Sequence, residues 1–86
     1  MFTPDFINEE QGEFLLVASH SLASPESIKL SIAYNIARMS YGLSQVPSHI
    51  QTCRVVYDIR GQSISDLVLA QIKQAYEQVA IVEFKC

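Results

Sequence analysis

Three residues near the carboxyl end have the types and spacing of a metal-dependent phosphodiesterase site. Glu83 and Lys85 are two residues apart, so on a β-strand both side chains face the same side. Asp58 lies on an earlier predicted strand and joins them if the two strands are neighbours. Paired carboxylates hold Mg²⁺ or Mn²⁺, which polarises a scissile phosphate, and a lysine orients or activates water. The alternative interpretation is a charged edge strand that resists pairing with other chains.

A second polar cluster follows the strand that contains Asp58. Asp58, Arg60 and Gln62 belong to the segment DIRGQ, between the predicted strand end and a predicted helix start. Ligands of parallel sheets gather at such corners, where the helix amino terminus favours an anion. The sequence therefore predicts an anionic-ligand site at these three residues. A local Asp58–Arg60 ion pair, or a turn capped by Asp58, is the structural alternative.

Neither histidine has a predicted catalytic role. His20 lies between Ser19 and Ser21, but a Ser–His nucleophile requires an orienting acid and an oxyanion site. No segment of the sequence marks either feature, and His49 lies in a Pro-Ser-His loop without an evident partner. We therefore expect both histidines to be loop residues.

The strands that position these residues are predicted from short apolar or alternating segments. Thr3–Asn8 and Glu13–Ser19 are expected to form a hairpin around a turn that ends at Gly12. In Arg54–Ile59, Val55, Tyr57 and Ile59 are expected to face one way and Val56 and Asp58 the other. Ala80–Phe84 is the last predicted strand.

Two helices are predicted between the strands. Ser24-Pro25-Glu26 is a typical helix start, with a capping serine, a proline in the first turn and an acidic residue near the positive end of the dipole. The expected buried stripe is Ile28, Ile32, Ile36, Met39 and Leu43, widened by Ala33 and Ala37, with Gly42 and Pro47 at the helix end. The second helix begins at Ser63-Ile64-Ser65-Asp66, and its expected buried face is Leu67, Val68, Ile72, Tyr76 and Val79. The predicted fold is one α/β (α+β) domain over residues 1–86, a small mixed sheet in the order β-hairpin–α–β–α–β.

This order resembles the restriction-endonuclease-like nuclease domains of bacterial polymorphic and contact-dependent toxins. The resemblance rests on PDF at Pro4–Phe6 and on the segments GEFLLVASHS, SPESIKLSIAYNIARMS and RVVYDIRGQSIS. It implies that Asp5 is the first carboxylate of the family's metal site and that Leu16 and Ala18 stand where the second carboxylate and the lysine would be. The resemblance therefore implies the fold of these nucleases and a degenerate active site.

Composition limits the classes of partner. The 86 residues carry a net charge of −3, and the six lysines and arginines are scattered, which disfavours nucleic acid as a partner. No apolar run spans a membrane, and MFTPDFINEE lacks the pattern of a signal peptide, so we expect a cytoplasmic protein. Cys53 and Cys86 are expected to be reduced thiols.

The predicted function follows from the degenerate site and the apolar content. Apolar residues make up 49% of the chain, which favours a homo-oligomer interface or a protein partner. The sequence thus predicts a non-catalytic interaction protein, derived from a toxin-like nuclease or a mobile element, that self-associates as a homodimer. The alternatives are a metal-dependent nuclease and a small anionic-ligand-binding regulatory module. No cofactor is predicted, except Mg²⁺ or Mn²⁺ if the nuclease alternative holds.

Overall fold

The fold is α/β, with three parallel strands that alternate with two helices. The computed structural model describes residues 6–8 and 12–86. The elements follow in the order β1 (Phe6–Asn8), β2 (Glu13–Ala18), α1 (Pro25–Gln45), β3 (Thr52–Asp58), α2 (Asp66–Tyr76) and β4 (Ile81–Lys85). Strands β2, β3 and β4 pair in parallel, and the short β1 pairs antiparallel with β2. The sheet is therefore built from two β–α–β units. The predicted hairpin corresponds only to the short antiparallel pairing of β1 with β2, and the main part of the sheet is parallel.

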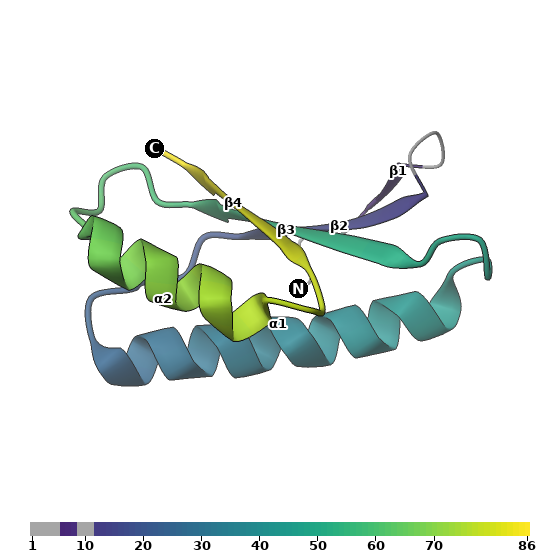
Figure 1. Ribbon diagram of the computed structural model, residues 1–86, viewed down its shortest axis with the longest axis horizontal. Helices are drawn as coiled ribbons and strands as arrows, with labels where there is room; N and C mark the ends of the chain where they lie inside the picture. Colours follow the sequence, from purple (N-terminus) through teal and green to yellow (C-terminus); the bar gives the residue numbers. More distant parts are fainter. Residues whose placement is uncertain (1–5, 9–11) are drawn as a thin grey trace.

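Both helices cover one face of the sheet (Figure 1). The sheet order is β1-β2-β3-β4, so the connections through α1 and α2 step in the same direction. Right-handed crossovers that step the same way place their helices on the same side. We call this side the helix-covered face. The opposite side, the outer face, has no helix over it in the part of the chain that the structure describes.

The core lies between the helix-covered face and the two helices. Alternate residues of the strands point into it, as the period of two requires. The inward residues are Phe14, Leu16 and Ala18 of β2, Cys53, Val55 and Tyr57 of β3, and Val82 of β4, all buried. The predicted orientation of Val55, Tyr57 and Ile59 is confirmed. Leu15 and Val17 of β2 are only half-buried on the outer face.

Helix α1 begins as predicted, but it is rotated relative to the predicted stripe. Ser24 caps it and accepts from the Ser27 N–H. The residues that point most directly into the core are Ser31, Asn35, Met39 and Gly42. The predicted Ile28, Ile32, Ile36 and Leu43 flank this line and are half-buried, while Ala33 and Ala37 are exposed. The predicted stripe is confirmed at Met39, and its other large residues pack beside the buried line. They are not at its centre because the buried line has polar residues there.

Gly42 does not end α1, which continues to Gln45. A Cβ at position 42 would overlap the Phe14 ring of β2. The glycine therefore permits close packing of the helix on the sheet.

Helix α2 has a narrower buried face than predicted. Ser65 caps it by accepting from the Val68 N–H, and Ile72 and Tyr76 are buried. Leu67 is 70% exposed and Val79 is 53% exposed. Leu67 lies in the first turn, and Val79 follows the end of the helix, so neither lies over the sheet.

No helix in residues 6–8 and 12–86 combines the length and apolarity needed to cross a membrane. Cys53 lies in the first half of β3, whereas Cys86 follows the end of the parallel β4, so the two thiols lie at opposite ends of the sheet and form no disulfide.

Candidate functional site

The structure brings Asp58, Glu83 and Lys85 together on the outer face. Strands β3 and β4 are parallel neighbours, and Asp58 is the register partner of Lys85. Glu83 pairs with Val56, one step earlier on the same face. The predicted juxtaposition of the three residues is therefore present in the fold.

The Glu83 carboxylate is already engaged by an arginine. Arg54 Nη1 donates to Glu83 Oε1, and the same guanidinium donates to both carboxylate oxygens of Glu13, at 3.3 Å and 3.0 Å. Glu13 is buried, so this two-point contact satisfies a carboxylate that water scarcely reaches. The hydrogen bond to Glu13, and then the charges of both carboxylates, raise the pKa of Arg54.

Asp58 is engaged by the arginine of its own turn. Arg60 Nε donates to Asp58 Oδ1 at 2.9 Å, and Nη2 donates to Oδ2 at 2.6 Å. The Arg60 N–H also donates to Oδ1, and these bonds lower the pKa of Asp58 to about 2. Within the described residues, no group of three or more His, Cys, Asp and Glu side chains is arranged to hold a metal ion. Asp5 lies outside the described residues.

Gln62 joins two loops. Its Oε1 accepts from the Leu22 N–H and its Nε2 donates to the His20 carbonyl, both at 2.9 Å. This pair of bonds fixes the β2–α1 loop against the β3–α2 loop. The Gln62 amide therefore does not join Asp58 and Arg60, and an anionic-ligand site at the three residues stays a prediction.

A polar cluster that sequence reasoning missed lies inside the core. The hydroxyl oxygens of Tyr57 and Tyr76 are 2.7 Å apart, and both rings are fully buried. Asn35 Nδ2 donates to both oxygens at 3.2 Å. Asn35 is also fully buried, at the centre of the inward line of α1. The cluster ties together α1, β3 and α2.

The cluster extends to the surface in two directions. On one side the Tyr57 hydroxyl lies 2.9 Å from Ser31 Oγ, which lies 2.6 Å from His20 Nδ1. On the other side Arg38 Nη1 donates to Asn35 Oδ1 at 3.3 Å. A continuous hydrogen-bonded path therefore runs from the guanidinium through the core to the imidazole.

Burial sets the ionisation of His20, at one end of this path, and of Tyr76, within it. Burial, and then the charge of Arg38, lower the pKa of His20, so its imidazole is neutral near pH 7. Burial, and then the hydrogen bond to Tyr57, raise the pKa of Tyr76 far above its usual value. The path is thus a chain of neutral donors and acceptors next to one guanidinium.

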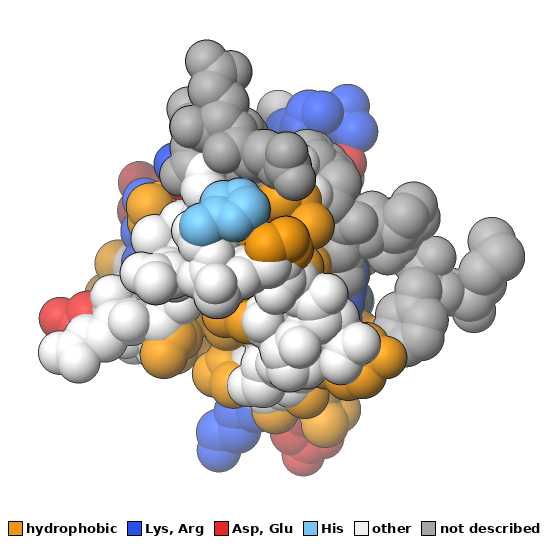
Figure 2. Space-filling model, turned by 90° about the vertical axis from the view of Figure 1, so that its right-hand side faces the viewer, with side chains coloured by type: hydrophobic (Ala, Val, Ile, Leu, Met, Phe, Trp, Pro, Cys, Tyr) orange, Lys and Arg blue, Asp and Glu red, His pale blue; other side chains and the backbone are white. Residues whose placement is uncertain are grey.

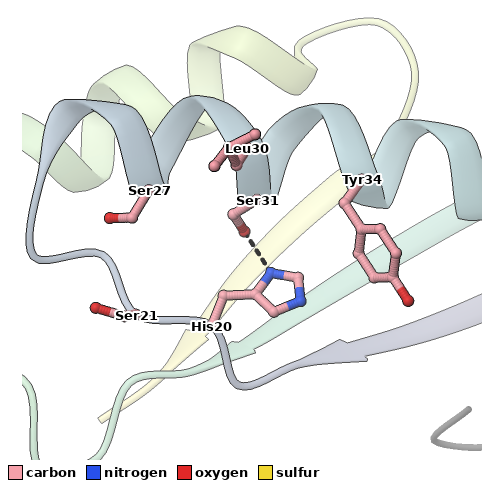
Figure 3. Close-up of a pocket in the computed structure, with 6 residues that line it drawn as sticks. All are labelled: His20, Ser21, Ser27, Leu30, Ser31 and Tyr34. Atoms are coloured by element: carbon pink, nitrogen blue, oxygen red, sulfur yellow. Dashed lines mark hydrogen bonds between the residues drawn. The ribbon is translucent and has the colours of Figure 1, made fainter. Parts of the chain in front are cut away.

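His20 faces a pocket of about 440 Å³ between the β2–α1 loop and α1 (Figure 3). The lining residues are His20, Ser21, Ser27, Leu30, Ser31 and Tyr34, and the exposed lining is mainly apolar. The His20 and Tyr34 rings meet edge to face at 5.5 Å. Mostly apolar walls with a few polar groups are typical of small-molecule sites.

The Ser31–His20 pair has the contact of a nucleophile and its base, but not their setting. Ser31 Oγ is buried and shared with Tyr57, which leaves it poorly placed for attack. No carboxylate in the described part of the chain bonds the imidazole to orient it. The geometry therefore favours binding over acyl transfer.

The sequence did contain a signal for the cluster. Ser31, Asn35 and Met39 are spaced by four residues, so they share one helix face, and Tyr57 and Tyr76 were both predicted to point inward. Polar residues on a face that packs against buried tyrosines need partners there. Which partners they find depends on the packing of α1 against β3 and α2.

No protein-family model, curated protein or solved structure matches this chain. The resemblance to toxin nuclease domains therefore stays a prediction. Leu16 and Ala18 lie on the helix-covered face with at most 1% of their surface exposed. A carboxylate and a lysine at these positions would lie in the core beneath the helices.

Proposed function

We propose that this chain is a non-catalytic, cytoplasmic interaction domain that self-associates by pairing two β4 strands edge to edge. The observation that carries the proposal is the free edge of β4. This strand pairs with β3 on one side and has no neighbour on the other in the described sheet. Exposed strand edges readily accept another strand.

The backbone groups available at this edge belong to Val82 and Phe84. The Ile59 N–H donates to the Lys85 carbonyl, so the polar groups of Lys85 point toward β3. Because they alternate along a strand, those of Val82 and Phe84 point away from the sheet. A second copy of β4 can therefore form a ladder without breaking a bond of the domain.

The sequence of β4 favours one antiparallel register. A two-fold axis at Phe84 places Glu83 of each copy opposite Lys85 of the other, so two unlike charge pairs form. An axis at Glu83 would oppose the two Glu83 carboxylates, and an axis at Val82 would oppose Ile81 and Glu83. Unlike charges opposite each other stabilise a ladder and like charges destabilise it.

Apolar surface lies beside the proposed interface. Val79, two residues before β4, is 53% exposed, and Ile81, its first residue, is 48% exposed. Burial of such side chains in a dimer is worth roughly 25 cal/mol per Å² of apolar surface. This surface complements the backbone ladder, which alone gives little specificity.

A nuclease function has less support. The carboxylates of Asp58 and Glu83 each accept hydrogen bonds from an arginine. On the visible face of Figure 2, within the described residues, basic side chains lie singly around the rim and form no patch for a nucleic-acid backbone. Descent from a degenerate toxin nuclease is part of the proposal and rests on the resemblance of the sequence alone.

The test is the mass of the protein in solution, measured by light scattering after size exclusion. We expect a dimer for the wild type, and a monomer for Glu83→Lys and for Lys85→Glu, since each single change opposes like charges. The double variant with both changes restores unlike pairs and should again be a dimer. A wild-type monomer at about 100 μM, or a double variant as monomeric as the single variants, contradicts the proposal.

A parallel measurement addresses the nuclease alternative. We expect millimolar Mn²⁺ to leave the melting temperature of the wild type and of Glu83→Gln equally unchanged. A rise in the wild type alone would support a metal site that includes Glu83.

A further inference from the structure

The buried path from Arg38 to His20 can have only one hydrogen-bond direction. Arg38 has donors and no acceptor, so the Asn35 atom it contacts is the carbonyl oxygen. Asn35 Nδ2 therefore faces the tyrosines and donates one hydrogen to each hydroxyl oxygen. Both oxygens thus already accept a bond from Asn35.

These bonds determine where the hydroxyl hydrogens of Tyr76 and Tyr57 point. Within the described chain, the Tyr76 oxygen contacts only Asn35, which donates to it, and Tyr57. The buried Tyr76 hydrogen therefore bonds Tyr57, because an unpaired buried donor costs about 1–3 kcal/mol. The Tyr57 hydrogen then bonds Ser31 Oγ.

The same reasoning fixes the tautomer of His20. Ser31 Oγ accepts from Tyr57, so its own hydrogen donates to His20 Nδ1. Nδ1 is then the unprotonated nitrogen of a neutral imidazole, and the hydrogen is on Nε2. Figure 3 shows this second nitrogen on the side of the ring away from Ser31. No described residue bonds Nε2, so it offers a donor at the pocket.

The pocket around this donor is lined mainly by apolar surface. Leu30 and the Tyr34 ring supply apolar wall, and Leu30 is 71% exposed. The Arg38 guanidinium lies over the Tyr34 ring, 5.5 Å from its centre. None of the six lining residues is acidic. An anion next to His20 therefore meets an N–H donor and no opposing carboxylate from the lining.

We propose that this pocket binds a small carboxylate with an apolar body, which accepts a hydrogen bond from His20 Nε2 and packs against Tyr34 and Leu30. Asn35, Tyr57, Tyr76 and Ser31 are positioning residues that hold the imidazole in the donating tautomer. The site is separate from the β4 edge, so it does not depend on self-association.

The first experiment uses the wild-type protein and nuclear magnetic resonance of its histidine and tyrosine rings. At about pH 8, where the imidazole is neutral, we expect His20 to show a protonated Nε2 and an unprotonated Nδ1. Addition of benzoate should shift the His20 and Tyr34 resonances with saturation and leave His49 unchanged. Benzyl alcohol has the same ring without the carboxylate and should bind about tenfold more weakly, as expected when a charged hydrogen bond is lost.

Two variants distinguish the hydrogen bond that His20 gives the ligand from the residues that hold His20 in the donating tautomer. His20→Phe keeps a ring next to Tyr34 and removes the donor, so benzoate affinity should fall about tenfold. Tyr57→Phe changes no lining residue but removes the hydrogen that Ser31 accepts, so His20 should become a mixture of tautomers and benzoate should bind less tightly. His49→Phe is the matched control and should bind benzoate as the wild type does.

Three outcomes would overturn the proposal, and the wild type alone can produce each of them. One is a His20 with its hydrogen on Nδ1. Another is the absence of saturable shifts at His20 and Tyr34 with millimolar benzoate. The third is equal affinity for benzoate and benzyl alcohol, which would show that the pocket does not select for the carboxylate.

Discussion

The two faces of the sheet use polar residues in opposite ways. On the outer face the charged residues form ion pairs within the domain: Arg54 with Glu13 and Glu83, and Arg60 with Asp58. On the helix-covered face uncharged hydroxyl and amide groups form a continuous buried path. The outer residues are charged and of the types associated with catalysis, whereas the inner residues are uncharged amides and hydroxyls.

Burial explains why we expect the uncharged inner residues to contribute more to stability than the charged outer residues. The exposed pairs Arg54–Glu83 and Arg60–Asp58 gain little because water and salt screen their charges, and among the described residues only the Glu13 carboxylate on this face is buried. A buried hydroxyl has no water to replace a lost partner, so each bond in the path constrains its neighbours. The difference between the faces can be tested by removing polar groups from each.

Asn35→Ala should have the largest effect. It removes the amide that bonds both tyrosines and Arg38, and it leaves several buried groups without a partner. We expect the free energy of unfolding to fall by about 3 kcal/mol, measured by urea denaturation. A loss below about 1 kcal/mol would show that the cluster does not stabilise the fold as a unit.

Removal of either tyrosine hydroxyl should cause the next largest loss of stability, and the loss should be larger for Tyr57 than for Tyr76. The Tyr57 hydroxyl contacts Ser31, Asn35 and Tyr76, whereas the Tyr76 hydroxyl contacts Asn35 and Tyr57. Tyr57→Phe should therefore cost about 2 kcal/mol and Tyr76→Phe about 1 kcal/mol. The double variant should cost less than the sum, because the second change removes a group that the first left unpaired. Strict additivity in denaturation experiments would argue against the coupled path.

The third largest effect should be the pH dependence of stability that His20 causes on the helix-covered face. Burial and the Arg38 charge lower the pKa of His20 in the folded protein, so the unfolded chain takes up its proton first as the pH falls below about 6.5. Protonation would also make Nδ1 a donor to Ser31 and reverse the hydroxyl bonds. We expect the melting temperature to decline as the pH falls from about 7 toward 5. His20→Phe should flatten this decline and His49→Phe should not; an unchanged decline in the His20 variant would exclude this cause.

The outer face should give the smallest effect. The bonds from Arg60 lower the pKa of Asp58 from 3.8 to about 2, so their stabilisation is complete above the higher value and is lost as the pH falls through the lower one. Asp58→Asn removes this stabilisation, which is small because water screens the pair, so the melting temperature should fall only slightly near pH 7 and should decline less between these two values. A large loss at neutral pH would show that this ion pair matters more than its exposure implies.

Local patterns in the sequence were sufficient for most of the secondary structure. The alternation in β3, the serine cap of α1 and the β–α–β order depend on neighbouring residues, and the structure has them. The cap of α2 is Ser65, not the first serine of the predicted start at Ser63–Asp66. The apolar spacing of α1 predicted that a helix forms there, but it did not predict which side of the helix faces the sheet. Gly42 is a residue that predicts a helix end, whereas in the structure it lies inside α1 and makes room for the Phe14 ring.

The sequence by itself determined the elements, their order and the presence of inward tyrosines, because these follow from periodicity and local capping. Only the tertiary structure decided that Ser31 and Asn35 face those tyrosines and that His20 reaches Ser31. These contacts join residues 11 to 41 positions apart, so their geometry depends on how helices and sheet pack. The packing also decided that the conspicuous charges of the outer face bond one another, which no spacing along the chain specifies.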